Sequence, residues 1–90
     1  MYRIIYTESY NKKAKKFLRK HPEILEQYRK TLQLAELDIH HPSLRLHPLK
    51  GKLTGIHSIS INLSYRITLY LIVKEKELIP VDIGTHDEVY

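Results

Sequence analysis

The chain has 90 residues, a mass of 10.7 kDa, no cysteine and a formal net charge of +5. Domains commonly span about 50 to 250 residues, so this length excludes a second independent core and predicts a single domain over residues 1–90. Leu, Ile, Val and Phe make up 28 of the 90 residues, which excludes a disordered chain, and the absence of cysteine excludes disulfides and a thiolate zinc site.

The positive charge lies in the first half of the chain. Residues 1–52 carry 12 basic and 5 acidic side chains, whereas residues 53–90 carry 3 and 5. A basic domain attracts phosphate polymers, anionic membranes or acidic proteins, and charge alone leaves these three open. Residues 1–6 are too short and too soon followed by charge for the hydrophobic region of a signal peptide. The longest apolar stretch, 67–73, is far below the ~20 residues of a membrane helix. We therefore expect a cytoplasmic protein without a membrane partner.

The first half of the sequence predicts a strand followed by two helices. Residues 3–6 are β-branched or aromatic and predict a short strand, after which Thr7 or Ser9 can cap a helix. The helix has apolar residues at helical spacing, and six basic residues occupy its other faces. The apolar set is Tyr10, Ala14, Phe17 and Leu18. His21-Pro22 ends this helix, and a second one runs to about Asp38 with Ile24, Leu25, Tyr28, Leu32 and Ala35 inward.

After residue 42 the apolar period changes from 3.6 to 2, which predicts strands. We expect them at 43–47, 57–63, 65–73 and 78–86, with a glycine-bearing loop at 50–55, a turn at 62–64 and a charged hairpin tip at 74–77. Alternation predicts Ile59, Ile61 and Leu63 on one face of their strand, and Ile79, Val81 and Ile83 on one face of the last strand. The fold class is α+β, in the order β-α-α-β-β-β-β. An antiparallel helical hairpin packs on one face of a largely antiparallel sheet and leaves the other face open.

Strand alternation also predicts which titratable side chains share the open face. Arg45 and His47 oppose Leu44 and Leu46, Arg66 opposes Ile67, and His86 opposes Ile83 if that strand continues. Histidine transfers protons near neutral pH, and arginine holds phosphate through a bidentate fork. These residues suit cleavage of RNA through its own 2′-hydroxyl, which requires no cofactor and no metal. The ordinary alternative for each residue is a solvated surface position or turn.

The chain resembles a known family in the order of its elements and in three short motifs. These motifs are Leu46-His47-Pro48-Leu49-Lys50-Gly51, the strand Tyr65-Arg66-Ile67, and the ending Ile83-Gly84-Thr85-His86-Asp87-Glu88-Val89-Tyr90. The resemblance covers essentially the whole chain. The chain resembles the RelE/ParE superfamily of bacterial and archaeal type II toxins, and its ending is most similar to the YafQ-like branch.

The resemblance implies a small toxin that enters the ribosomal A site, cuts mRNA there and is restrained by an antitoxin. His47 matches the site histidine of YafQ-like enzymes, His86 the C-terminal histidine of proton transfer, and Tyr90 the terminal aromatic position. Arg66 matches the arginine that stabilises the transition-state phosphate, and Lys50 and Lys52 match the RNA-binding loop. We count Arg45 with these two lysines as RNA-binding residues.

Three serines depart from the family pattern. Ser58 and Ser60 stand where YafQ-like sites have an acidic residue and a histidine, and Ser64 stands in place of an aspartate. His57 could substitute, but it shares the parity of Ile59. Three functions therefore stay open: a ribosome-dependent mRNA endoribonuclease, a ParE-like inhibitor of DNA gyrase, and a catalytically decayed homologue that binds the antitoxin. We expect a monomer when the toxin is alone and a heteromeric complex with the antitoxin.

Overall fold

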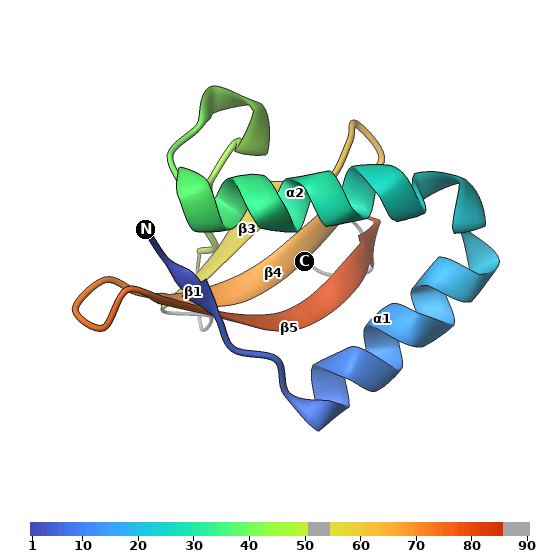
Figure 1. The fold of residues 1–90 in the computed structure, drawn as a ribbon, viewed down its shortest axis with the longest axis horizontal. Coiled ribbons are helices and arrows are strands. Elements are labelled where there is room, and N and C mark those ends of the chain that lie inside the picture. Colours follow the sequence, from blue (N-terminus) through green and yellow to red (C-terminus); the bar gives the residue numbers. More distant parts are fainter. Residues whose placement is uncertain (51–54, 86–90) are drawn as a thin grey trace.

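Two helices cover one face of a five-stranded sheet in the computed structural model, which describes residues 1–50 and 55–85 (Figure 1). The sheet has the order β1-β5-β4-β3-β2, in which β1 runs parallel to β5 and the other pairs are antiparallel. The fold is thus α+β with the predicted element order. The elements are β1 (Arg3–Ile4), α1 (Glu8–Lys20), a 3₁₀ turn (Pro22–Ile24), α2 (Leu25–Leu37), a second 3₁₀ turn (Pro42–Leu44), β2 (His47–Pro48), β3 (Ile56–Ser60), β4 (Tyr65–Ile72) and β5 (Glu77–Thr85).

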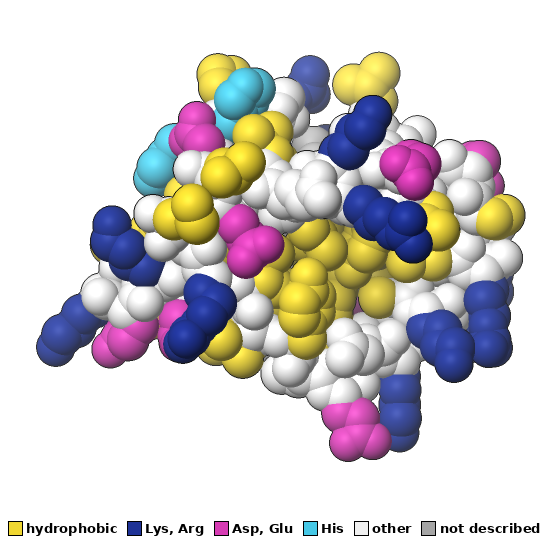
Figure 2. Space-filling model, viewed as in Figure 1, with side chains coloured by type: hydrophobic (Ala, Val, Ile, Leu, Met, Phe, Trp, Pro, Cys, Tyr) yellow, Lys and Arg dark blue, Asp and Glu magenta, His cyan; other side chains and the backbone are white. Residues whose placement is uncertain are grey.

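The two helices begin and end where the sequence predicts. Thr7 caps α1, since its hydroxyl accepts a hydrogen bond of 3.1 Å from the Tyr10 amide. Pro22 stands at the start of the 3₁₀ turn that leads into α2. The helices diverge from this corner, and Figure 2 shows hydrophobic side chains between them, with Lys and Arg toward the rim. Among the described residues, no helix is long and apolar enough to cross a membrane.

A pair of tyrosines joins the helices inside the core. The Tyr10 and Tyr28 hydroxyls lie 2.8 Å apart, and the two residues are only 1% and 8% exposed. Burial raises the pKa of both phenols, because the core disfavours the phenolate. For Tyr10, the negative charge of an ionised Tyr28 and the hydrogen bond between the two hydroxyls raise the pKa further. Both hydroxyls therefore keep their protons to higher pH in the folded protein than an exposed tyrosine does.

The strand predicted over residues 43–47 is wrong. Residues Pro42–Leu44 form a 3₁₀ turn, which Arg45 ends in the left-handed region at φ 49°, and β2 contains only His47–Pro48. Proline suits the first position of such a turn, and the His41 ring nitrogen Nδ1 caps it by accepting from the Ser43 amide. The alternation of Leu44 and Leu46 here reflects a turn that buries Leu44 and half-buries Leu46.

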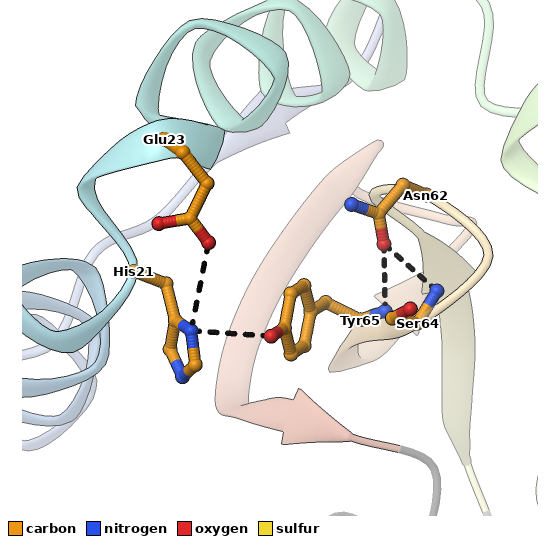
Figure 3. Close-up of polar contacts among 5 residues, drawn as sticks. All are labelled: His21, Glu23, Asn62, Ser64 and Tyr65. Atoms are coloured by element: carbon orange, nitrogen blue, oxygen red, sulfur yellow. Dashed lines mark hydrogen bonds and ion pairs between the residues drawn. The ribbon is translucent and has the colours of Figure 1, made fainter.

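The turn between β3 and β4 forms at the predicted residues. Asn62 Oδ1 accepts hydrogen bonds from the amides of Ser64 at 2.9 Å and Tyr65 at 2.8 Å (Figure 3). The Tyr65 hydroxyl lies 3.1 Å from His21 Nδ1, which links the start of β4 to the helical corner. Leu63, predicted to share the buried face of Ile59 and Ile61, is instead 81% exposed because it lies at the tip of this turn.

A bulge in β5 changes the predicted alternation of the last strand. Leu69 pairs with Pro80 but Thr68 pairs with Asp82, so Val81 is an extra residue in the ladder. Pro80, before the bulge, and Ile83, after it, are both buried on the core face of the sheet. The prediction that Ile79, Val81 and Ile83 share one face is therefore wrong, since the extra residue shifts the parity after Pro80.

Candidate active site

The candidate site lies on the face of the sheet opposite the helices. His47 is registered opposite Ser58, which is opposite Thr68 on β4. In the next row, Ser60 is opposite Arg66. Residues opposite each other in a sheet share a face, so His47 and Arg66 lie on the same side as predicted. Strand spacing of about 4.8 Å and a rise of about 3.3 Å per residue place their Cα atoms roughly 12 Å apart.

Arg66 is held on this face by a hydrogen bond to Ser60. Its Nη1 donates to Ser60 Oγ at 2.6 Å, and the residue is partly buried. Its Nε is buried and has no hydrogen-bond partner in the described part of the chain. Within residues 1–50 and 55–85, no carboxylate forms an ion pair with this guanidinium. A cation with donor capacity that forms no ion pair among the described residues favours an anionic ligand.

His47 is fixed in orientation by the backbone just before it. Its Nδ1 lies 2.9 Å from the carbonyl oxygen of Arg45. Because a carbonyl only accepts, Nδ1 must carry the proton in this contact, and the neutral ring then has its lone pair on Nε2. The left-handed backbone of Arg45, at φ 49°, belongs to the turn that brings this carbonyl to the ring. The arrangement suits a general base whose reactive nitrogen is Nε2.

Small hydroxyl residues form the centre of the site, and they are not open to solvent. Ser58 is 0% exposed, Thr68 3% and Ser60 7%. The expectation of an open sheet face is therefore wrong at its centre, because these short side chains lie in rows with the longer His47 and Arg66. Ser58 Oγ has no hydrogen-bond partner among the described residues. Among the described residues, the face is a partly covered polar surface that carries His47, Arg66 and, opposite Thr68, Asp82.

The remaining predicted residues are placed differently or lie outside the description. Arg45 is exposed at the end of a turn and not on a strand, and Lys50 is exposed just after β2. Ser64 is in the β3–β4 turn and not on the site face. Three of the predicted site residues, Lys52, His86 and Tyr90, lie outside the described residues.

Ser60 is the site residue whose role the sequence did not predict. We expected it only as a departure that removes an acid or histidine, whereas it accepts a hydrogen bond from Arg66. Its strand parity with Arg66 was the available signal.

His57 and His40-His41 take no part in the site. His57 is opposite Leu69 in the ladder, and so lies on the face of Ile59 as its parity predicts. His40 and His41 lie in the turn after α2, which agrees with their interpretation as helix-terminal residues. Across residues 1–50 and 55–85, no three His, Cys, Asp or Glu side chains gather in a way that could hold a metal ion.

Comparison with solved structures identifies the class of fold. No protein-family model matches the chain, and no curated protein matches it in sequence. YafQ from Escherichia coli superimposes with a TM-score of 0.79 at 16% identity, over 100% of this chain and 99% of that one. YafQ in the E. coli DinJ-YafQ toxin-antitoxin complex gives 0.78 at 20% identity, over 99% and 97%.

Two further neighbours are toxins from other bacteria. A metal-bound toxin from Helicobacter pylori gives a TM-score of 0.77 at 23% identity, over 100% of both chains. A YoeB/ParE toxin from Agrobacterium tumefaciens gives 0.74 at 19% identity, over 96% of this chain and 99% of that one. The chain therefore has the fold of the RelE/ParE toxin superfamily, as the motifs predicted. Structures of YafQ are among its near neighbours.

Proposed function

We propose that the chain is the toxin of a type II toxin-antitoxin system, and that residues 1–90 act as one domain that cuts mRNA in the ribosomal A site. The observation that supports this is the placement of His47 and Arg66 on one sheet face, with Arg66 held by Ser60 and without a carboxylate partner among the described residues. The fold shared with YafQ and YoeB/ParE toxins supports the toxin role.

The proposed reaction uses the substrate's own 2′-hydroxyl as the nucleophile. His47 accepts its proton at Nε2 while the 2′-oxygen bonds to phosphorus and the bond from phosphorus to the 5′-oxygen breaks. His86 returns a proton to the leaving 5′-oxygen, and Tyr90 is a further residue of the proposed site. The products are a 2′,3′-cyclic phosphate and a free 5′-hydroxyl. Arg66 stabilises the charge that builds on the phosphate oxygens. Arg45, Lys50 and Lys52 hold the flanking backbone, and no metal takes part.

Cleavage of mRNA in a cell-free translation system tests this function. The wild-type protein should produce breaks near the ribosome, and Arg66→Ala, His47→Ala or His86→Ala should lower the cleavage rate by roughly two to four orders of magnitude. Lys74→Ala is the matched control, because Lys74 is exposed in the β4–β5 hairpin and distant from the site in the ladder. Unchanged cleavage by Arg66→Ala would contradict the proposal.

The proposed protein partner is an antitoxin with an acidic, amphipathic segment. The basic side chains of α1 are exposed, and they form a cationic surface outside the candidate site. The exposed set is Lys12, Lys13, Lys15, Lys16, Arg19 and Lys20. YafQ has been solved in complex with the antitoxin DinJ, which supports a protein partner for this fold. Higher salt should slow the association, because charges on exposed surfaces are screened. A short acidic reading frame beside the gene would identify the candidate.

The same experiment distinguishes the two alternative functions. One structural neighbour is a YoeB/ParE toxin, so a gyrase inhibitor is the second candidate. Intact mRNA together with inhibited gyrase supercoiling would favour it. Intact mRNA, normal supercoiling and retained antitoxin binding would favour a catalytically decayed homologue.

A further inference from the structure

Two polar atoms on the site face are buried without hydrogen-bond partners. Within residues 1–50 and 55–85, three buried side-chain nitrogen or oxygen atoms lack a partner, and two of them are Ser58 Oγ and Arg66 Nε. The third, His57 Nδ1, belongs to a residue on the helix-covered face. A buried donor without a partner destabilises a folded protein, so such atoms are rare and call for an explanation.

Ser58 lies between the two residues of the proposed reaction. It is opposite His47 on β2, and it is one row away from the pair of Ser60 and Arg66. A strand spacing of about 4.8 Å and a rise of about 3.3 Å per residue place the Ser58 Cα about 5 Å from that of His47 and roughly 8 Å from that of Arg66. Ser58 is therefore nearer to each of these residues than they are to one another.

The substrate has to span the same gap. In the proposed reaction the 2′-hydroxyl reaches His47 while Arg66 binds the oxygens of the adjacent phosphate, and the 2′-oxygen lies about 3–3.5 Å from the phosphorus that it attacks. The phosphate then lies above β3, the strand between β2 and β4. On β3, Ser60 already accepts from Arg66 at 2.6 Å, whereas the hydroxyl of Ser58 is unused among the described residues.

We propose that Ser58 is a further catalytic residue, whose hydroxyl donates a hydrogen bond to a non-bridging oxygen of the phosphate as negative charge builds on it. The inference rests on the proposed function. Ser58 keeps its proton throughout, since no base among the described residues contacts its Oγ to activate it as a nucleophile. Arg66 supplies the positive charge and Ser58 a neutral donor on a rigid strand, and the two together stabilise the charged oxygens.

A ligand reaches Ser58 only if a side chain moves, because the residue is 0% exposed. Arg66 carries the longest side chain in the neighbouring row, and its Nε makes no hydrogen bond in the described part of the chain that would fix it. We therefore expect a closed site in the free protein, which opens when a phosphate draws the Arg66 side chain toward itself.

Ser58→Ala separates a catalytic role from a structural one. The variant loses a buried hydroxyl that has no partner, so its melting temperature should be higher than that of the wild type by roughly 4–8 °C. Its cleavage of mRNA should fall about a hundred-fold, as on loss of one donor to a charged transition-state oxygen. Ser64→Ala, in the exposed β3–β4 turn, is the matched control and should change neither. A lower melting temperature, or cleavage at the wild-type rate, would overturn the inference.

A sulfur-substituted substrate tests the contact itself. An mRNA in which sulfur replaces one non-bridging oxygen at the cut bond presents a weaker hydrogen-bond acceptor there. The wild type should cut one of the two stereoisomers about ten-fold more slowly than normal mRNA. This penalty should shrink in Ser58→Ala, because the donor is already absent. Equal penalties in the wild type and in Ser58→Ala, for both stereoisomers, would contradict the contact.

These outcomes also separate the inference from the proposed function. If Arg66→Ala lowers cleavage and Ser58→Ala does not, the nuclease proposal stands and the inference is wrong. If the wild type cuts no mRNA, the nuclease proposal fails, and inorganic phosphate tests the contact alone. At constant ionic strength, phosphate should then raise the melting temperature of the wild type more than that of Ser58→Ala. Equal stabilisation of the two proteins would overturn the phosphate contact as well.

Discussion

Replacing Tyr10 by phenylalanine should destabilise the fold through loss of one buried hydrogen bond. The Tyr10 and Tyr28 hydroxyls lie 2.8 Å apart between the two helices, and Tyr10 is 1% exposed. Phenylalanine keeps the ring and its packing, so the substitution leaves no large cavity. It removes the hydrogen bond and leaves the Tyr28 hydroxyl without its partner.

The expected cost follows from that geometry. An intramolecular hydrogen bond contributes about 1 kcal/mol net, and a buried hydroxyl left without a partner costs about 1–3 kcal/mol. Tyr28 is 8% exposed, so we expect about 1–2 kcal/mol for Tyr10→Phe. In a domain of this length, each kcal/mol lowers the melting temperature by roughly 4–8 °C. The double variant Tyr10→Phe/Tyr28→Phe should lose less than the sum of the single variants, because it leaves no orphaned hydroxyl.

Alkaline pH should expose the same pair. Burial raises the pKa of both phenols above the ordinary value of 10.0. Below pH 10 the folded and unfolded chains both hold these protons, so the contribution to stability is fully present. As pH rises above 10, the unfolded chain loses them first, and the free energy of unfolding falls by up to about 1.4 kcal/mol per pH unit for each phenol. The double variant should show a shallower fall than the wild type.

Urea unfolding of the wild type, Tyr10→Phe, Tyr28→Phe and the double variant, followed by circular dichroism from pH 7 to 11.5, measures these free energies. Tyr70→Phe is the matched control, because that tyrosine is 42% exposed. A loss below about 0.3 kcal/mol for Tyr10→Phe at pH 7, or equal pH dependence in the wild type and the double variant, would refute the reasoning.

Two further predictions concern the site and a helix end. Ser60→Ala should lower mRNA cleavage about ten-fold, because it removes the hydrogen bond to the Arg66 guanidinium. Ser64→Ala should leave cleavage unchanged in the same assay, and equal losses for both serines would contradict the role of Ser60. Thr7→Ala should cost about 1 kcal/mol in urea unfolding, because it removes the cap of α1. A free energy of unfolding equal to that of the wild type would show that the cap is not needed.

The sequence predicted the helices and most strands because their signals are local. Thr7 and Pro22 mark helix starts, and period-two alternation marks the strands on either side of Asn62. The same alternation between residues 43 and 47 was misleading, because a short 3₁₀ turn can also bury one leucine and half-bury the next. The turn ends at the left-handed backbone of Arg45, and a non-glycine residue gives little sign of that conformation.

The candidate site was partly predictable for the same reason. Parity correctly placed Arg66 on the face away from Ile67, whereas His47 reaches the same face through its register with Ser58 and not through the strand predicted over residues 43–47. The burial of Ser58 was not predictable, because it depends on neighbours in adjacent strands. The hydrogen bond between Ser60 and Arg66 depends on register, which the sequence of one strand does not define.

The bulge at Val81 determines which side of the sheet the last residues of β5 belong to. If Val81 instead paired with Thr68 in an unbroken ladder, every later position of β5 would turn over. Asp82 and Gly84 would then enter the core, and Ile83 would lie on the polar face. A single inserted residue thus lets a short strand serve the core in its first half and again in its second, while a proline occupies its middle.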